Sequence, residues 1–124
     1  MATGKPGTME RVKDEIIAAV QGAGDIAQAT MHTASQTARA AIRDAADVGA
    51  DLGAEAIDLV TGAIEAAKEL GVSVEEAAAA AAQGALKGAE QLGSTALGAV
   101  RHALTGTISG VKVVLKEPFK QQES

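Results

Sequence analysis

Apolar residues recur every eleven positions along almost the whole chain. The purest set begins at Val12, and its members are all Val or Ala. They are Val12, Ala23, Ala34, Ala45, Ala56, Ala67, Ala78, Ala89, Val100 and Val111. Because eleven residues make three helical turns at about 3.67 residues per turn, these positions stay on one side of a helix. The pattern therefore predicts long amphipathic helices and an all-α fold.

Two further apolar sets with the same spacing lie beside the first and widen the apolar side to an arc of roughly 130°. One set holds the bulkier side chains, and acidic residues such as Asp47 and Asp58 recur on the opposite side. We expect the chain to associate through this arc. The predicted association face comprises the larger residues Val20, Met31, Ile42, Ile64, Leu86, Leu97, Val100, Leu104 and Ile108, with the small residues Gly84, Gly88, Gly106 and Gly110.

Residues that stop and start helices interrupt the pattern near its middle. Gly71 suits a left-handed helix C-cap, and Ser73-Val74-Glu75-Glu76 has the S-x-x-E arrangement of a capping box. We therefore predict two long amphipathic helices, at about 9–70 and 74–115, that form a hairpin or a kinked pair in an oligomeric bundle. The eleven-residue phase continues through the break without a shift, which leaves one continuous helix open as an alternative.

The repeat also divides the chain into regions. We expect a flexible N-terminus at 1–8, a helical repeat domain at 9–117 and a polar tail at 118–124. A weaker break is predicted at 22–24, where Asp25 follows two glycines and can cap a new helix.

Six glycines lie within the second predicted helix. They are Gly84, Gly88, Gly93, Gly98, Gly106 and Gly110. Each costs about 0.8 to 1 kcal/mol relative to Ala inside a helix, so this helix should not be stable alone. The pairs Gly84/Gly88 and Gly106/Gly110 would let a neighbouring backbone approach closely, which indicates that the second helix is the more enclosed one. The alternatives are that the glycines mark flexibility, or that 110–115 is extended, since it is rich in Val.

Composition narrows the choice of partners. The chain has 124 residues with one Phe, no Trp, no Tyr and no Cys, against 29 Ala and 14 Gly. A net charge of −5 argues against nucleic acid as a partner, because that affinity depends on Lys and Arg. No secretory leader is expected, and the longest uncharged stretches, such as 77–86, are too short to span a bilayer. A cytoplasmic location is therefore expected.

Candidate chemistry is sparse. His32 and His102 have no His, Asp or Glu three or four residues away, so a helical metal site is not expected. The acidic row from Asp44 to Asp58 has the spacing of one helix face and could gather cations weakly, but it lacks the loop of a calcium site. No nucleophile elbow or phosphate-binding loop occurs. We expect no enzyme activity, no metal and no cofactor.

The Ala- and Gly-rich eleven-residue repeat resembles the eleven-mer class of late embryogenesis abundant proteins, and its period is similar to that of the exchangeable apolipoproteins and the synucleins. The resemblance covers residues 12 to 115 and concerns pattern and composition. It implies a non-enzymatic, stress-protective or scaffold-like helical protein. We expect it to be a homo-oligomer; the alternative is a peripheral protein that coats a lipid surface or granule through weak membrane contact.

Overall fold

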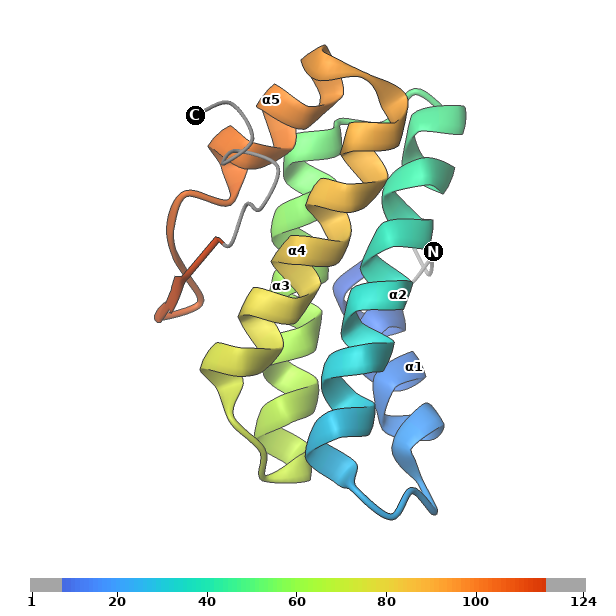
Figure 1. Ribbon diagram of the computed structural model, residues 1–124, viewed down its shortest axis with the longest axis vertical. Coiled ribbons are helices and arrows are strands. Elements are labelled where there is room, and N and C mark those ends of the chain that lie inside the picture. The colour runs from blue at the N-terminus through green and yellow to red at the C-terminus, as the bar shows by residue number, and fades with distance from the viewer. Residues whose placement is uncertain (1–7, 116–124) are drawn as a thin grey trace, which may run out of the picture.

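Five helices and one short hairpin make up residues 8–115, the part of the chain that the computed structural model describes (Figure 1). The elements are α1 (Thr8–Val20), α2 (Ile26–Asp47), α3 (Leu52–Leu70), α4 (Val74–Leu92), α5 (Ser94–Ala103), β1 (Gly106–Ile108) and β2 (Val111–Val113). The chain is therefore mostly helical, but the prediction of two long helices is wrong. The predicted helix 9–70 comprises α1, α2 and α3, and the predicted helix 74–115 comprises α4, α5 and the hairpin.

Two of the helix boundaries are those that the sequence predicts. Asp25 caps α2, since its side chain accepts a hydrogen bond from the backbone N–H of Gln28 at 3.0 Å. Gly71 ends α3 in the left-handed region at φ 75°, and the Ser73 hydroxyl accepts from the N–H of Glu76 at 3.1 Å to begin α4. The breaks at 22–24 and 71–73 are confirmed.

Two further turns lie where an unbroken helix was expected. Gly49 adopts a φ of 73°, and Asp51 then caps α3 by accepting from the N–H groups of Gly53 and Ala54. Gly93 separates α4 from α5 with a φ of 124° and is the N-cap of α5, so no side-chain hydrogen bond caps that helix. The eleven-residue phase conceals both turns because it passes through them unchanged.

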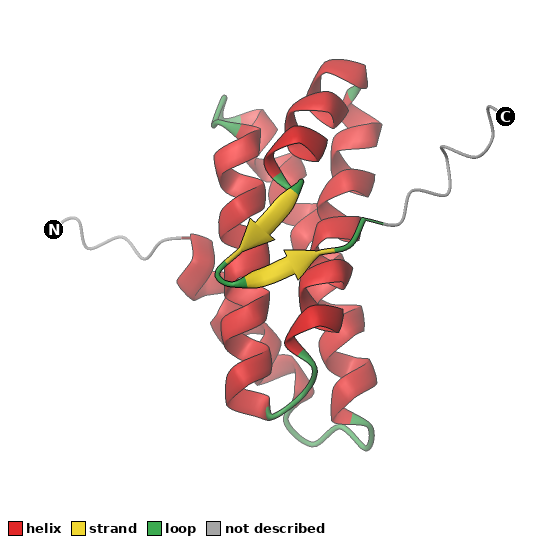
Figure 2. Ribbon diagram, turned by 90° about the vertical axis from the view of Figure 1, so that its left-hand side faces the viewer, coloured by secondary structure: helices red, strands yellow, loops and turns green. Residues whose placement is uncertain are grey.

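A two-stranded antiparallel hairpin follows α5 and replaces the end of the predicted second helix. Ser109 and Gly110 form its two-residue turn with φ values of 52° and 80°, the left-handed pair that a tight hairpin requires. Ile108, Val111 and Val113 are buried, while the residues between them face outward. Figure 2 shows the hairpin lying across one side of the helices, where β1 contacts α3 and β2 contacts α4.

Glycines bring the closest pairs of helices together. The Cβ of an alanine at Gly84 would collide with the carbonyl oxygen of Ser35, and one at Gly88 would lie 2.7 Å from the carbonyl oxygen of Arg39. These contacts set α4 directly against α2, and Figure 1 shows the two helices side by side. Gly62 of α3 similarly faces α1, where a Cβ would lie 2.6 Å from the Met9 carbonyl oxygen.

The predicted apolar positions of the eleven-residue repeat lie inside the bundle, and the predicted acidic positions lie outside. Ala34, Ala45, Ala56 and Ala89 are buried, and Asp47 and Asp58 are exposed. The apolar arc therefore points inward in each helix in turn, and the chain's own helices cover it. The structure gives no support for the expected oligomeric bundle as the means of covering the arc. Residues 1–7 of the predicted flexible N-terminus and the predicted polar tail lie outside the described residues, whereas Thr8 begins α1.

We predict that Gly84→Ala destabilises the fold and that Gly98→Ala stabilises it. At Gly84 the new methyl group meets the Ser35 backbone, and overpacking of this kind costs about 1 to 3 kcal/mol, more than the helix propensity that Ala restores. Gly98 is exposed on α5 with nothing within 4 Å of its added Cβ, so the propensity gain of about 1 kcal/mol remains. Urea unfolding of both variants checks this, and equal free energies of unfolding would contradict the close α2–α4 contact.

Candidate functional site

The predicted association face is occupied within the chain. Seven of its nine larger residues are buried, and Met31 and Leu97 are half-buried against the same core. The buried ones are Val20, Ile42, Ile64, Leu86, Val100, Leu104 and Ile108. These side chains therefore pack helix against helix in one molecule and do not form a free surface.

The four glycines of that face divide into two groups. Gly84 and Gly88 allow a close helix contact, as predicted, but the neighbouring backbone is the chain's own α2. Gly106 and Gly110 are exposed, lie at positive φ in the hairpin, and have nothing within 4 Å of an added Cβ. In the predicted second pair, Gly106 thus begins β1 and Gly110 lies in the hairpin turn, and neither brings two helices together.

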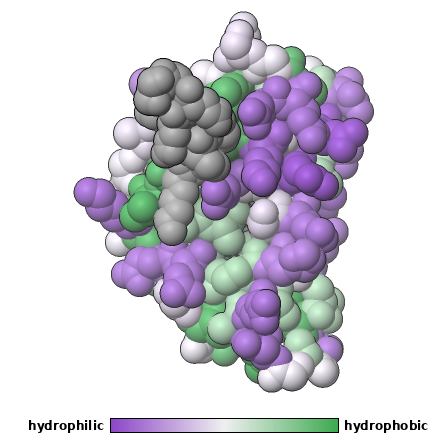
Figure 3. All heavy atoms as spheres, in the orientation of Figure 1, coloured by the Kyte–Doolittle hydropathy of each residue, from purple (hydrophilic) through white to green (hydrophobic). Residues whose placement is uncertain are grey.

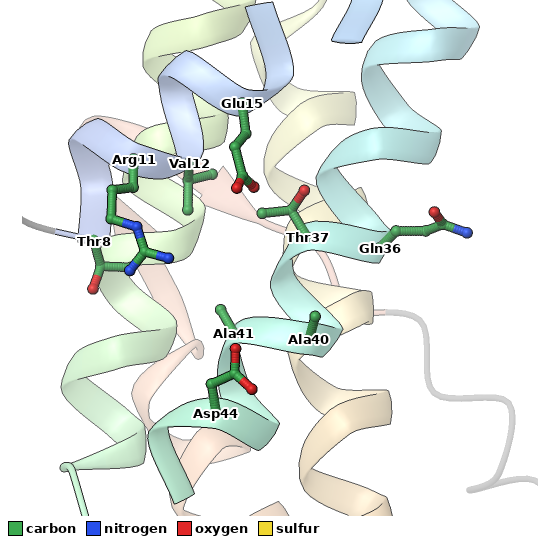
Figure 4. Close-up of a pocket in the computed structure, with 9 residues that line it drawn as sticks. All are labelled: Thr8, Arg11, Val12, Glu15, Gln36, Thr37, Ala40, Ala41 and Asp44. Atoms are coloured by element: carbon green, nitrogen blue, oxygen red, sulfur yellow. The ribbon is translucent and has the colours of Figure 1, made fainter. Parts of the chain in front are cut away.

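A groove lined by both polar and apolar side chains lies between α1 and α2 (Figure 4). The groove has a volume of about 260 Å³. Its lining residues are Thr8, Arg11, Val12 and Glu15 from α1, with Gln36, Thr37, Ala40, Ala41 and Asp44 from α2. Val12 and Ala41 form apolar parts of its wall, and charged side chains stand around them.

Charges of both signs face each other across this groove. Figure 4 shows the Arg11 guanidinium reaching from α1 toward α2, with the Glu15 carboxylate on one side and the Asp44 carboxylate on the other. Neither Arg11 nor Asp44 forms an ion pair within residues 8–115. A second hollow, next to the α2–α3 turn, shares Arg11, Ala41 and Asp44 with the groove and is also lined by Val48 and Glu55. The groove therefore carries exposed charges of both signs that form no ion pair among the described residues.

Two polar contacts fix α1, one wall of the groove, against α3. The Thr8 hydroxyl donates to Glu55 Oε2 at 2.9 Å, and Lys13 Nζ lies 3.4 Å from Glu69 Oε2. The hydrogen bond and the charge of Glu69 raise the pKa of Lys13 above its ordinary value of 10.5. Thr8 therefore contacts a neighbouring helix, in addition to beginning its own.

The other candidate residues lie apart from one another. His32 is exposed beside Asp25 and Gln28 in a shallow hollow, and His102 is exposed in the last turn of α5. The acidic row does not follow one helix, because the turn at Gly49 divides it.

Within that row, Asp51 binds backbone N–H groups of α3 and Glu55 accepts from Thr8. Over residues 8–115, no group of three His, Cys, Asp or Glu side chains is arranged to hold a metal ion. No helix in the same range combines the length and apolar character needed to cross a bilayer.

Comparisons with models of protein families, with curated proteins and with solved structures give no match to this chain.

Sequence reasoning did not identify the groove. Arg11 and Asp44 are 33 residues apart, three whole repeats, so the repeat places both on the same solvent-exposed side of the predicted amphipathic helix. Only the turn between α1 and α2 brings them to opposite sides of one hollow. The spacing marks them as exposed, but no local signal shows that they face each other.

We predict that Lys13 contributes to stability in its charged form and that this contribution is lost at high pH. Because the pKa is raised in the folded state, the contribution is complete below 10.5 and disappears as the pH rises through the folded value. The difference in free energy of unfolding between the native chain and Lys13→Met should therefore shrink on the alkaline side. Urea titrations well below and well above that pH measure it. As the control, the same comparison in a Glu69→Gln background, which removes the group that raises the pKa of Lys13, should show a smaller change with pH.

Proposed function

We propose that this protein is a non-enzymatic, stress-protective helical protein that keeps its apolar arc inside a closed bundle and exposes it when the bundle opens. The exposed arc then associates with further copies or with the apolar surface of damaged proteins. The observation that carries the proposal is the burial of one eleven-residue register through all five helices and into β2. Its buried members are Val12, Ala34, Ala45, Ala56, Ala67, Ala78, Ala89, Val100 and Val111.

The composition of the core supports opening under mild stress. Of the 26 buried hydrophobic residues within 8–115, 13 are Ala, and none is aromatic. Burial stabilises in proportion to the apolar area removed from water, about 25 cal/mol per Å², and an alanine methyl contributes far less area than a Leu or Ile side chain. With a core of this kind, the closed bundle has a small free energy of unfolding.

The spacing of the turns supports a continuous arc in the open state. Gly49, Gly71 and Gly93 lie 22 residues apart, which is two repeats. If the turns straightened, the apolar registers of neighbouring helices would join in phase, because 22 residues return to the same side of a helix. A closed bundle by itself would not require its turns to keep this spacing.

The test is to lock part of the bundle with a disulfide. The chain has no cysteine, and a Cβ at Gly53 would lie 3.3 Å from the Cβ of Ala103, close to the usual 3.5 to 4.5 Å of a disulfide. In the oxidised Gly53→Cys/Ala103→Cys variant, α3 and α5 cannot separate. We expect this form to lose most of its ability to suppress the heat-induced aggregation of a client enzyme, measured by light scattering.

The reduced form of the same variant is the matched control and should protect like the native chain. Equal protection by the oxidised and reduced forms would contradict opening between α3 and α5. Circular dichroism of both forms before heating establishes that each is folded.

The second candidate function is the coating of a lipid surface, and the in-phase turns favour it as well, since a flat surface needs one continuous arc. Lys13, Lys68 and Lys112 recur at multiples of eleven and would lie along the border of that arc. Flotation with vesicles of anionic phospholipid separates the two proposals. Binding to the vesicles together with a gain in helix content supports the lipid function, and protection of the client without vesicle binding supports the first.

A further inference from the structure

Residues 94–115, which form α5 and the hairpin, make a separable arm of the bundle. Among the described elements the arm contacts only α3 and α4, whereas α1 to α4 also contact one another. Figure 1 shows the arm folding back from the end of α4, and Figure 3, in the same view, shows hydrophobic residues at the left edge, where the hairpin lies. Detachment of the arm would therefore leave the contacts among the first four helices in place.

The arm covers one side of α3. Gly53 faces α5, since a Cβ added there would lie 3.3 Å from the Cβ of Ala103, whereas Gly62 faces α1. The two glycines lie on opposite sides of α3, because the step from one to the other is about two and a half helical turns. Val60 and Ile64 follow Gly53 by about two and three turns, so they lie on the side of the arm, and both are fully buried.

The side of α4 that meets the arm is also apolar. Gly84 faces α2, and a residue two positions away on a helix points to the opposite side, at about 200°. Ala82 and Leu86 occupy those two positions and are buried. The arm thus covers one apolar surface, which we call the α3–α4 face and which consists of Val60, Ile64, Ala82 and Leu86. The arm's own buried residues are Val100, Leu104, Ile108, Val111 and Val113.

One glycine joins the arm to the bundle. Gly93 has a φ of 124° and a ψ of 174°, a conformation that is essentially restricted to glycine. No side chain caps α5, and a helix that continued through Gly93 would pair the first N–H groups of α5 with the last carbonyls of α4. The repeat keeps its phase across the hinge, since Ala89 and Val100 are eleven residues apart. A straight hinge therefore gives one regular helix over 74–103, which carries the arm away from its own bundle.

We infer that the arm is exchangeable and that two copies form a domain-swapped dimer when the hinge straightens. The arm of each copy then docks on the α3–α4 face of the other. The occupant is a second copy because its arm offers the same apolar side chains, at the same spacing, that cover this face in the monomer. The repeat stays covered in both forms, so the inference does not rest on the opening that the proposed function requires.

The first experiment changes the hinge. Ala at position 93 is strained in the observed turn but suits a continuous helix. We expect Gly93→Ala to raise the dimerisation constant by about tenfold or more in sedimentation equilibrium. When Gly53→Cys and Ala103→Cys are added, oxidation should join two chains and give a covalent dimer on a non-reducing gel. With the native hinge at low micromolar concentration, the same pair should close within one chain.

The matched control for the hinge is Gly98→Ala. This substitution adds the same methyl group to α5, in open space, and raises helix propensity equally in the monomer and in the exchanged dimer. It should leave the dimerisation constant unchanged. Circular dichroism establishes that each variant is folded.

The second experiment keeps the native hinge, so it decides the question even if Gly93→Ala does not fold. Chains with Gly53→Cys alone and chains with Ala103→Cys alone are mixed at millimolar concentration, warmed to just below the melting temperature, cooled and oxidised. A size tag on one kind of chain identifies the products on a non-reducing gel. Exchange brings the two positions together only in mixed pairs, so mixed dimers should exceed like-with-like dimers several-fold.

A folded Gly93→Ala chain that stays monomeric at millimolar concentration overturns the inference. Disulfides that form only within chains in its dimer, or equal amounts of mixed and like-with-like dimers in the second experiment, do so as well. Failure of the exchange together with loss of client protection on oxidation leaves the proposed function standing. Exchange together with equal protection by the oxidised and reduced native-hinge chain contradicts only the proposed function.

Discussion

The direct contact between the backbones of α2 and α4 is the constraint on which the rest of the structure depends. At Gly84 and Gly88 the carbonyl oxygens of Ser35 and Arg39 occupy the space that side chains would take. The two parallel helices therefore lie closer than helices with larger interface residues, and dispersion between backbones replaces the packing of large side chains. A core with so much Ala and no aromatic residue could not fill a wider gap, since interiors are close-packed. The glycines, which would destabilise an isolated helix, are thus what allows small side chains to form a core.

The eleven-residue repeat and the bundle are compatible because the last three interhelical turns are separated by whole numbers of repeats. Gly49, Gly71 and Gly93 recur after 22 residues, six helical turns, so α3 and α4, each with its turn, occupy two repeats. A helix that begins at the same phase as the preceding one presents the same positions of the repeat to the core, although the chain reverses direction. This explains how one register remains buried from α3 to α5. It also explains why the periodicity alone cannot distinguish a continuous helix from a bundle.

The predictable parts of the fold are those with a local physical cause. The side of each helix that is buried follows from the repeat, and the caps at Asp25 and Ser73 follow from side chains that accept backbone hydrogen bonds. The turns at Gly49 and Gly93 were missed because a glycine inside an unbroken pattern has no partner motif strong enough to outweigh the phase. The groove between α1 and α2 could not be predicted, since it exists only where separate helices meet.

The same geometry determines which surfaces remain for partners. In the closed bundle, most of the larger residues of the predicted association face are buried, and the outside consists mainly of the polar side of each helix. Apolar side chains then reach the surface chiefly near turns, where the chain must leave the helix and cannot keep every residue on the inner side. Val48 and Leu92 each immediately precede a turn glycine, which is why they are exposed despite belonging to an apolar register.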